Sequence, residues 1–216
     1  MVAVGLLSRL EDQPLRDEWL ARIAEGRARV AVGHPLNPLV ADAHVADLLL
    51  LPHEGALHAV APEEVKMQRV DSLDPSRRLF RLEWYPGTPV ATGEQAQRLW
   101  DEALNLGALA ASAQLLGLAQ RMLDISIDYV AQRKQFGKAV GSFQAVKHRL
   151  ADVVIQLEFA KPVVYRAAHA VAQNNPLAPV YVSHAKAAAS TVATAAARNC
   201  IQVQGAVYGF YAFIWR

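Results

Sequence analysis

The sequence of 216 residues contains a single cysteine, Cys200, and no apolar run long enough to cross a bilayer. One cysteine excludes an internal disulfide framework and any zinc site built on cysteines. The first residues lack the pattern of a secretory signal, because Glu11, Asp12 and Asp17 follow MVAVGLLSRL directly. These absences predict a cytosolic protein without membrane segments, in which Cys200 is a small buried side chain.

Acidic side chains are almost absent from the second part of the chain. Residues 1–128 carry 12 basic and 18 acidic side chains, a net charge of −6. Residues 129–216 carry 10 basic side chains and only two acidic ones, Asp152 and Glu158, a net charge of +8. A basic region on an alanine-rich scaffold predicts an anionic partner, either a nucleic acid or a small molecule that bears phosphate.

Proline is absent from residues 94–131, where Leu, Ala and Met recur at intervals of three and four. This pattern predicts one very long helix that ends near residue 132. A second helix is expected from Ser142, a favourable N-cap, to about Gln173. After the turn NNPLAP, a third helix is expected over 180–204. Three long helices with short connections predict an antiparallel bundle.

The region before the bundle differs in composition and in the spacing of its apolar residues. Residues 12–27 have the apolar spacing of a helix that stops at Gly26, and PGTPVATG (86–93) is a linker by composition. Between them lie five short β-type runs, which predict a small sheet or partial barrel: 29–32, 46–52, 56–62, 65–71 and 77–87. The predicted fold class is therefore α+β, mainly α, with a small β domain ahead of the helical bundle.

The break between the first two long helices holds the most basic stretch, YVAQRKQFGKAVGSFQAVKHRLAD (129–152). Cations near the C-terminal end of a helix favour its dipole, which accounts for Arg133 and Lys134 without any ligand. The dipole does not account for Phe136 beside Gly137 in a polar turn. An aromatic ring next to an arginine at a tight turn is a plausible platform for a stacked ring with a phosphate alongside.

The order RKQFGK–x3–FQ–x2–K–x2–LAD resembles the C-terminal helical domain of acyl-CoA dehydrogenases. The preceding AASAQLLGLAQRMLDISIDYVAQRKQFG is similar to the first long helix of that domain, and CIQVQGAV (200–207) is similar to the family's Q-x-x-G-G segment. The β-type runs resemble the middle β domain more weakly. The resemblance implies a remnant of an N-terminal helical domain at 1–28, a reduced middle β domain at 29–93 and a C-terminal helical bundle at 94–216.

The resemblance also implies a cofactor, FAD, for an enzyme that dehydrogenates acyl-CoA thioesters between the α and β carbons. By position in the motif, Arg133 matches the arginine that contacts the FAD pyrophosphate, and a guanidinium suits a diphosphate better than a lysine does. The other residues that match cofactor-binding positions are Gln135, Phe136, Gln144, Gln202 and Gly205. The implied partners are further subunits, either copies of this chain or another acyl-CoA dehydrogenase chain, and an electron-transfer flavoprotein.

The sequence departs from the family at the catalytic base, which is usually a glutamate just beyond Q-x-x-G-G. This chain has no acidic residue after Glu158, and the alternative position near Gly107 has none either. Asp101 and Glu102 are interpreted as a solvated helix start, so no catalytic residue is assigned. Two explanations stay open: a segment absent from the sequence after Val207, or a genuine loss of the base, as in subunits of heteromeric acyl-CoA dehydrogenases.

The middle domain departs as well, because GHPLNPLVADAHV replaces the family's T-E-P-x-x-G-S-D loop and the strand after it. A non-enzymatic alternative is therefore a silent subunit that completes the FAD site of a partner. A nucleic-acid binder is disfavoured, because the cations cluster at one turn and not along a helix face. His34, His44, His53 and His58 lack metal-ligand spacing and are interpreted as loop histidines, so no metal is expected. The sequence does not identify the acyl group.

Overall fold

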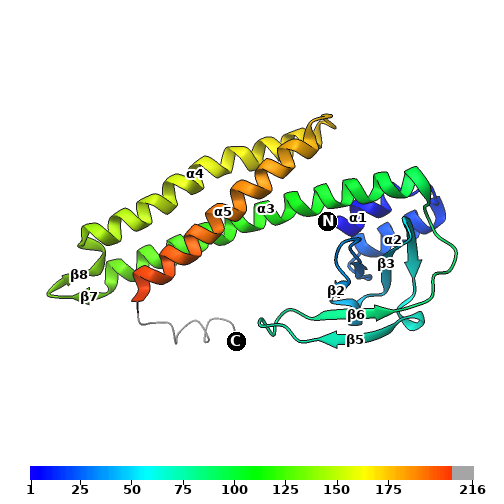
Figure 1. Cartoon of the computed structure of the whole chain (residues 1–216), viewed down its shortest axis with the longest axis horizontal. Helices are drawn as coiled ribbons and strands as arrows, with labels where there is room; N and C mark the ends of the chain where they lie inside the picture. Colours follow the sequence, from blue (N-terminus) through cyan, green and yellow to red (C-terminus); the bar gives the residue numbers. More distant parts are fainter. Residues whose placement is uncertain (206–216) are drawn as a thin grey trace. The chain divides into compact units, whose positions relative to one another are not determined.

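The computed structural model describes residues 1–205, and its secondary structure matches the predicted class, mainly α with a small β region. The chain divides into two compact units, Met1–Gly107 and Ala108–Arg216. In the described residues, no helix is both long and apolar enough to span a membrane. The elements in chain order are α1 Val2–Leu7, α2 Gln13–Ala24, β1 Val30–Val32, β2 Leu39–Ala41, η1 Ala43–Val45, β3 Leu48–His53, β4 Ala56–Val60, η2 Pro62–Glu64, β5 Lys66–Val70, β6 Leu79–Glu83, α3 Gly93–Gln132, β7 Lys134–Gln135, β8 Lys138–Ala139, η3 Val140–Ser142, α4 Gln144–Ala172 and α5 Ala178–Gln204 (Figure 1).

The first unit contains two three-stranded sheets, in the orders β1-β3-β4 and β2-β6-β5. Strand β3 is buried on both faces, because its side chains alternate between two cores. Leu48 and Leu50 pack with α1, α2 and the first turns of α3, whereas Leu49 and Leu51 pack with the second sheet. The five predicted strands are confirmed, but β2 and α1 were not predicted.

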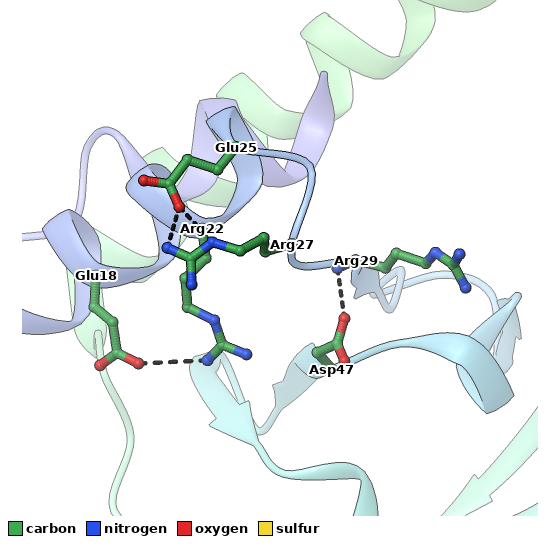
Figure 2. A network of polar contacts seen from close by, with 6 residues as sticks. All are labelled: Glu18, Arg22, Glu25, Arg27, Arg29 and Asp47. Atoms are coloured by element: carbon green, nitrogen blue, oxygen red, sulfur yellow. Dashed lines mark hydrogen bonds and ion pairs between the residues drawn. The ribbon is translucent and has the colours of Figure 1, made fainter.

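Polar contacts follow one another along the connection from α2 to the first sheet (Figure 2). Glu18 pairs with Arg22 on α2 at 3.4 Å, and Glu25 pairs with Arg27 just after it. The main-chain N–H of Arg29 donates to Asp47 Oδ2 at 2.7 Å, immediately before β3. Because these ion pairs are exposed, they fix the direction of the connection more than they stabilise the unit.

The second unit is an antiparallel bundle of α4, α5 and the part of α3 from Ala108 to Gln132, which lie side by side in Figure 1. Its core alternates large side chains such as Leu123 and Leu157 with alanines. On α5, Ala185, Ala189 and Ala196 are fully buried, and their small side chains let neighbouring helices approach closely. The three predicted helices are confirmed.

The start of the second long helix differs from the prediction. Ser142 does not cap α4, because its hydroxyl donates to the Ala139 carbonyl oxygen at 2.7 Å inside the short helix η3. The N-cap is instead Phe143, which makes no side-chain capping bond. Serine hydroxyls readily bond to nearby main chain, and here a preceding turn uses the group that would otherwise cap the helix.

Candidate cofactor-binding site

Between α3 and α4 the chain forms a small β-hairpin. Strand β7 pairs with β8, with Lys134 opposite Ala139 and Gln135 opposite Lys138. The two residues of the turn, Phe136 and Gly137, have φ angles of 54° and 79°. Positive φ at both positions is the signature of a type I′ turn, whose twist matches that of the paired strands.

The conformation of Phe136 is unusual for a bulky side chain and points to a constraint at this turn. Its side chain is 91% exposed at the tip of the hairpin. The ring lies edge-on to that of Phe143, with 6.3 Å between the centroids. Lys138 Nζ lies 4.4 Å from the centroid of the Phe143 ring, a cation–π contact. The hairpin thus presents an aromatic ring with cations around it.

Arg133 lies between the end of α3 and the first strand of the hairpin, β7. Its N–H donates to the Tyr129 carbonyl at 2.9 Å, as in a helix, and its own carbonyl accepts from the Val140 N–H at 2.7 Å, beyond the hairpin. The main chain of Arg133 is therefore held on both sides while the side chain is exposed. The main-chain bonds thus fix the point from which an exposed guanidinium group extends.

The last turn of α5 ends at the same end of the bundle. Arg149 Nη1 donates to Asn199 Oδ1 at 3.4 Å, which places the first turns of α4 beside the last turns of α5. Gln202 and Gly205 are exposed, whereas Val203 and Gln204 between them are buried. Gly205 has φ 63° and ψ −135°, a conformation that glycine alone adopts readily.

We call this region, residues 129–149 and 198–205, the basic end of the bundle. It carries six cationic side chains: Arg133, Lys134, Lys138, Lys147, Arg149 and Arg198. Within residues 1–205, none of the six forms an ion pair with a carboxylate. Cations that no carboxylate of the described residues neutralises, next to an exposed aromatic ring, suit a ligand that combines a phosphate with a planar ring.

All six residues predicted to bind the cofactor lie at this end. Arg133, Gln135 and Phe136 are on or next to the hairpin, Gln144 is the first residue of α4, and Gln202 and Gly205 end α5. Their side chains are exposed where they have one. Their contact with a cofactor stays a prediction.

The acids considered as bases lie elsewhere, in the first unit. Glu102 pairs with Arg9 at 2.5 Å, and Asp101 accepts a hydrogen bond from Gln97 at 2.9 Å. Both are exposed near the start of α3, in line with a solvated helix start. The other expected position of the base, beyond Val207, lies outside the described residues.

The interpretation of all four histidines as loop residues is wrong for two of them, since His53 lies in β3 and His58 in β4. His58 is 4% exposed and its ring packs against Trp84, 5.3 Å between centroids. Burial, and next the neighbouring His53, lowers the pKa of His58 below its usual value. Over the described part of the chain, no three potential metal ligands come together.

The segment GHPLNPLVADAHV (33–45) borders a cavity of about 510 Å³ in the first unit. Main-chain groups in this segment are bound locally: the Leu36 N–H donates to His34 Nδ1 and the Leu39 N–H to Asn37 Oδ1, both at 3.0 Å. The cavity walls include Leu51, Arg81 and Trp84. No pattern in the sequence indicates this cavity, because its walls come from distant segments.

The sequence also gave no sign of the buried polar contact between Ser126 and Gln204, 2.9 Å from Oγ to Nε2. The two residues are 78 positions apart, and Gln204 is one of the unassigned positions of the segment CIQVQGAV (200–207). A serine in the apolar face of a long helix was the one available signal.

Comparisons with known proteins agree with these observations. Residues 98–210 match the family model "Acyl-CoA dehydrogenase, C-terminal domain". The chain is 31% identical to "Acyl-CoA dehydrogenase IpdE2" of Mycobacterium tuberculosis over 191 residues, 87% of this chain and 54% of the relative. It is 38% identical over 109 residues to "Caffeyl-CoA reductase-Etf complex subunit CarC" of Acetobacterium woodii, 50% of this chain and 28% of the relative.

Solved structures show the same fold. The butyryl-CoA dehydrogenase of Megasphaera elsdenii superposes with a TM-score of 0.86 at 20% identity, covering 97% of this chain and 66% of that one. The ChsE4–ChsE5 complex of Mycobacterium tuberculosis gives a TM-score of 0.78 at 24% identity, covering 95% of this chain and 64% of that one. The chain spans about half the length of IpdE2 of Mycobacterium tuberculosis, and 87% of this chain takes part in that match.

Proposed function

The chain belongs to the acyl-CoA dehydrogenase family, and from this premise we propose that it is a flavoprotein subunit for α,β-dehydrogenation of an acyl-CoA thioester. The observation that carries the proposal is the exposed Arg133, which pairs with no carboxylate of residues 1–205, next to the exposed ring of Phe136 on a constrained hairpin. The family match covers both residues. Assignment of 1–28, 29–93 and 94–216 to the family's three domains is part of the same proposal.

FAD fits the donors at the basic end. The guanidinium of Arg133 offers a planar fork of donors for a diphosphate, and the ring of Phe136 offers an apolar surface for a flat ring system. Gln135, Gln144 and Gln202 supply exposed amides, and Gly205 lets the main chain approach a ligand without a side chain. When bound, FAD would supply the acceptor for the hydride removed from the substrate's β-carbon.

We further propose that the protein works in an oligomer. On α4, Ile155, Phe159 and Pro162 follow one another at intervals of four and three residues and lie on one exposed face. Ile155 is 54% exposed and Phe159 is 74% exposed. Contiguous exposed apolar side chains on a helix are typical of a protein–protein contact. The complexes named for relatives, ChsE4–ChsE5 and the Etf complex of CarC, support association with another dehydrogenase subunit and with an electron-transfer flavoprotein.

An alternative function is favoured by one specific observation, the lack of a carboxylate at either expected position of the base. In this alternative the chain is catalytically silent, and its basic end completes the FAD site of a partner chain that carries the base. General-base catalysis typically contributes about 10²–10⁴-fold and needs the base within hydrogen-bond reach of the proton. The middle domain, which has only a short loop in place of the flavin-contacting segment, supports the same arrangement.

Acyl-CoA-dependent reduction of an artificial electron acceptor distinguishes the complete enzyme from the silent subunit. The chain is assayed alone, saturated with FAD, and together with a family member that contains the T-E-P-x-x-G-S-D loop and the C-terminal glutamate. Turnover by the chain alone supports a complete enzyme, and turnover only with the partner supports the silent subunit. If no flavin binds in either preparation, the proposed function is wrong.

A further inference from the structure

The last turn of α5 is tied to α3 by a buried group of polar side chains, Ser126, Cys200 and Gln204, which we call the polar node. Ser126 is 0% exposed, Cys200 1% and Gln204 9%. Gln204 Nε2 donates to Ser126 Oγ at 2.9 Å, and Ser126 Oγ donates to the Met122 carbonyl oxygen at 2.8 Å. A serine and a glutamine that are 78 residues apart are thus joined inside the bundle.

The surroundings of the node are apolar. Val203 next to Gln204 belongs to the core of the bundle, together with Leu123 and Val130 of α3. Burial raises the pKa of the Cys200 thiol, and its contact with Ser126 opposes this only in part, so the thiol stays neutral. In such surroundings an amide or hydroxyl that is shifted out of register loses hydrogen bonds that no water replaces, which makes one register of the two helices preferable to its neighbours.

The node lies next to the residues that the proposed function uses. Arg133 follows Ser126 by seven residues, about 10 Å along the axis and on nearly the same side of a helix. Gln204 stands between the exposed Gln202 and Gly205 at a helix end, where main-chain carbonyls lose their helical partners and turns tend to fray. The bond to Ser126 therefore holds the part of α5 whose orientation decides where Gln202 and Gly205 point.

We propose that Ser126 and Gln204 are positioning residues, which hold the last turn of α5 in register with α3 so that Gln202, Gly205 and Arg133 face one ligand. The inference rests on the proposed function, because the ligand is taken to be FAD. It goes beyond that function by assigning a role to two buried residues that touch no cofactor. Ser126 lies in the segment 110–137 and Gln204 in the segment 200–207 that carry the family resemblance, but neither residue is among those that match a cofactor-binding position.

The chain provides a matched control for Ser126. Ser112 is also 0% exposed on α3, and its hydroxyl donates to the Ala108 carbonyl oxygen at 2.6 Å, the same local bond. Unlike Ser126, Ser112 has no hydrogen bond to α5 among those formed by the described residues. Ser112→Ala and Ser126→Ala therefore remove the same atom and the same helical bond, but only the second breaks the node.

The experiment measures FAD dissociation constants by quenching of flavin fluorescence, and thermal midpoints, on the full chain in the assembly in which it purifies. The variants are Ser126→Ala, Gln204→Leu, the double variant, Ser126→Thr and Ser112→Ala. Loss of one buried hydrogen bond is expected to weaken FAD binding about tenfold for Ser126→Ala and for Gln204→Leu. The double variant should bind FAD no more weakly than either single variant. Ser126→Thr should have the dissociation constant of the wild type. For Ser112→Ala the dissociation constant should stay within about twofold of the wild-type value, a difference of only about 0.4 kcal/mol.

Two results would overturn the inference. One is an unchanged FAD affinity in Ser126→Ala with a lowered thermal midpoint, which would make the node purely structural. The other is an equal loss of affinity in Ser112→Ala. If Gln204→Leu does not fold, the comparison of Ser126→Ala with Ser112→Ala decides alone. Wild-type protein that binds no FAD in any assembly would reject the proposed function itself, and the positioning role with it.

Discussion

Gly141 lies so close to Val130 that a β-carbon at position 141 would stand 3.1 Å from the Val130 carbonyl oxygen. The short helix η3 thus packs directly on the main chain of α3, and this contact seats the hairpin that carries Phe136. The oxygen belongs to a helix and cannot move away as a flexible side chain would. The place of the basic end therefore depends on a glycine with an ordinary φ angle.

Gly141→Ala is expected to lower the free energy of unfolding by about 1–3 kcal/mol, the usual cost of forcing extra atoms into a packed contact. Gly117→Ala is the control, since Gly117 lies inside α3 with nothing within 4 Å of an added β-carbon. There alanine should stabilise the helix by about 0.5–1 kcal/mol. Urea denaturation followed by circular dichroism measures both, and a shift of the same sign in the two variants would contradict this packing.

The buried His58 gives a prediction on pH. Its pKa in the folded protein lies below the unfolded value of about 6.5, so the unfolded chain binds more protons once the pH falls below that value. Stability from this group is fully present above pH 6.5 and is lost as the pH falls through the folded pKa. The urea midpoint should therefore fall less between pH 7.5 and 5.5 in His58→Gln than in the wild type.

His184→Gln is the control for His58, because His184 is exposed on α5. Its urea midpoint should follow that of the wild type across the same pH range. An identical fall for His58→Gln and the wild type would show that burial of this ring makes no contribution to acid sensitivity.

The exposed face of α4 predicts the effect of a charge on assembly. Phe159→Glu should reduce the mass measured by light scattering at micromolar concentration, since burying a carboxylate without a partner in an apolar contact is costly. Leu177→Glu is the control, because Leu177 is 53% exposed but lies in the turn before α5. A wild-type protein that is already monomeric, or an unchanged mass for Phe159→Glu, would exclude this face as an interface.

The long helices could be predicted from the sequence because their signal is local and repeated. Leu and Ala recur at helical spacing through α3, and no proline interrupts them. The basic break is also a local signal, because its cations and Gly137 are close together in the sequence. The sequence predicts a turn at Phe136–Gly137. What could not be read was the pairing of β7 with β8, since two-residue strands carry no periodicity.

Predictions failed where distant or competing contacts decide the structure. Ser142 has the chemistry of an N-cap, yet a nearer carbonyl at Ala139 takes its hydroxyl. His58 reads as a loop residue by composition but pairs with Leu51 in the middle of a hairpin. The bond between Ser126 and Gln204 depends on how two helices pack, and the local sequence around either residue does not identify its partner.

Flavin binding through Arg133 tests the central proposal most directly. Arg133→Ala removes a charge-assisted, bidentate donor while deleting little packing, because the side chain is exposed. Arg121→Ala is the matched control, an exposed arginine of α3 twelve positions earlier. The measurement is the ratio of flavin to protein absorbance after saturation with FAD and removal of unbound flavin, with the thermal midpoint recorded alongside. The account predicts a ratio at least about tenfold lower for Arg133→Ala, with wild-type values for Arg121→Ala and little change in either midpoint. Equal flavin content in Arg133→Ala and the wild type would contradict it.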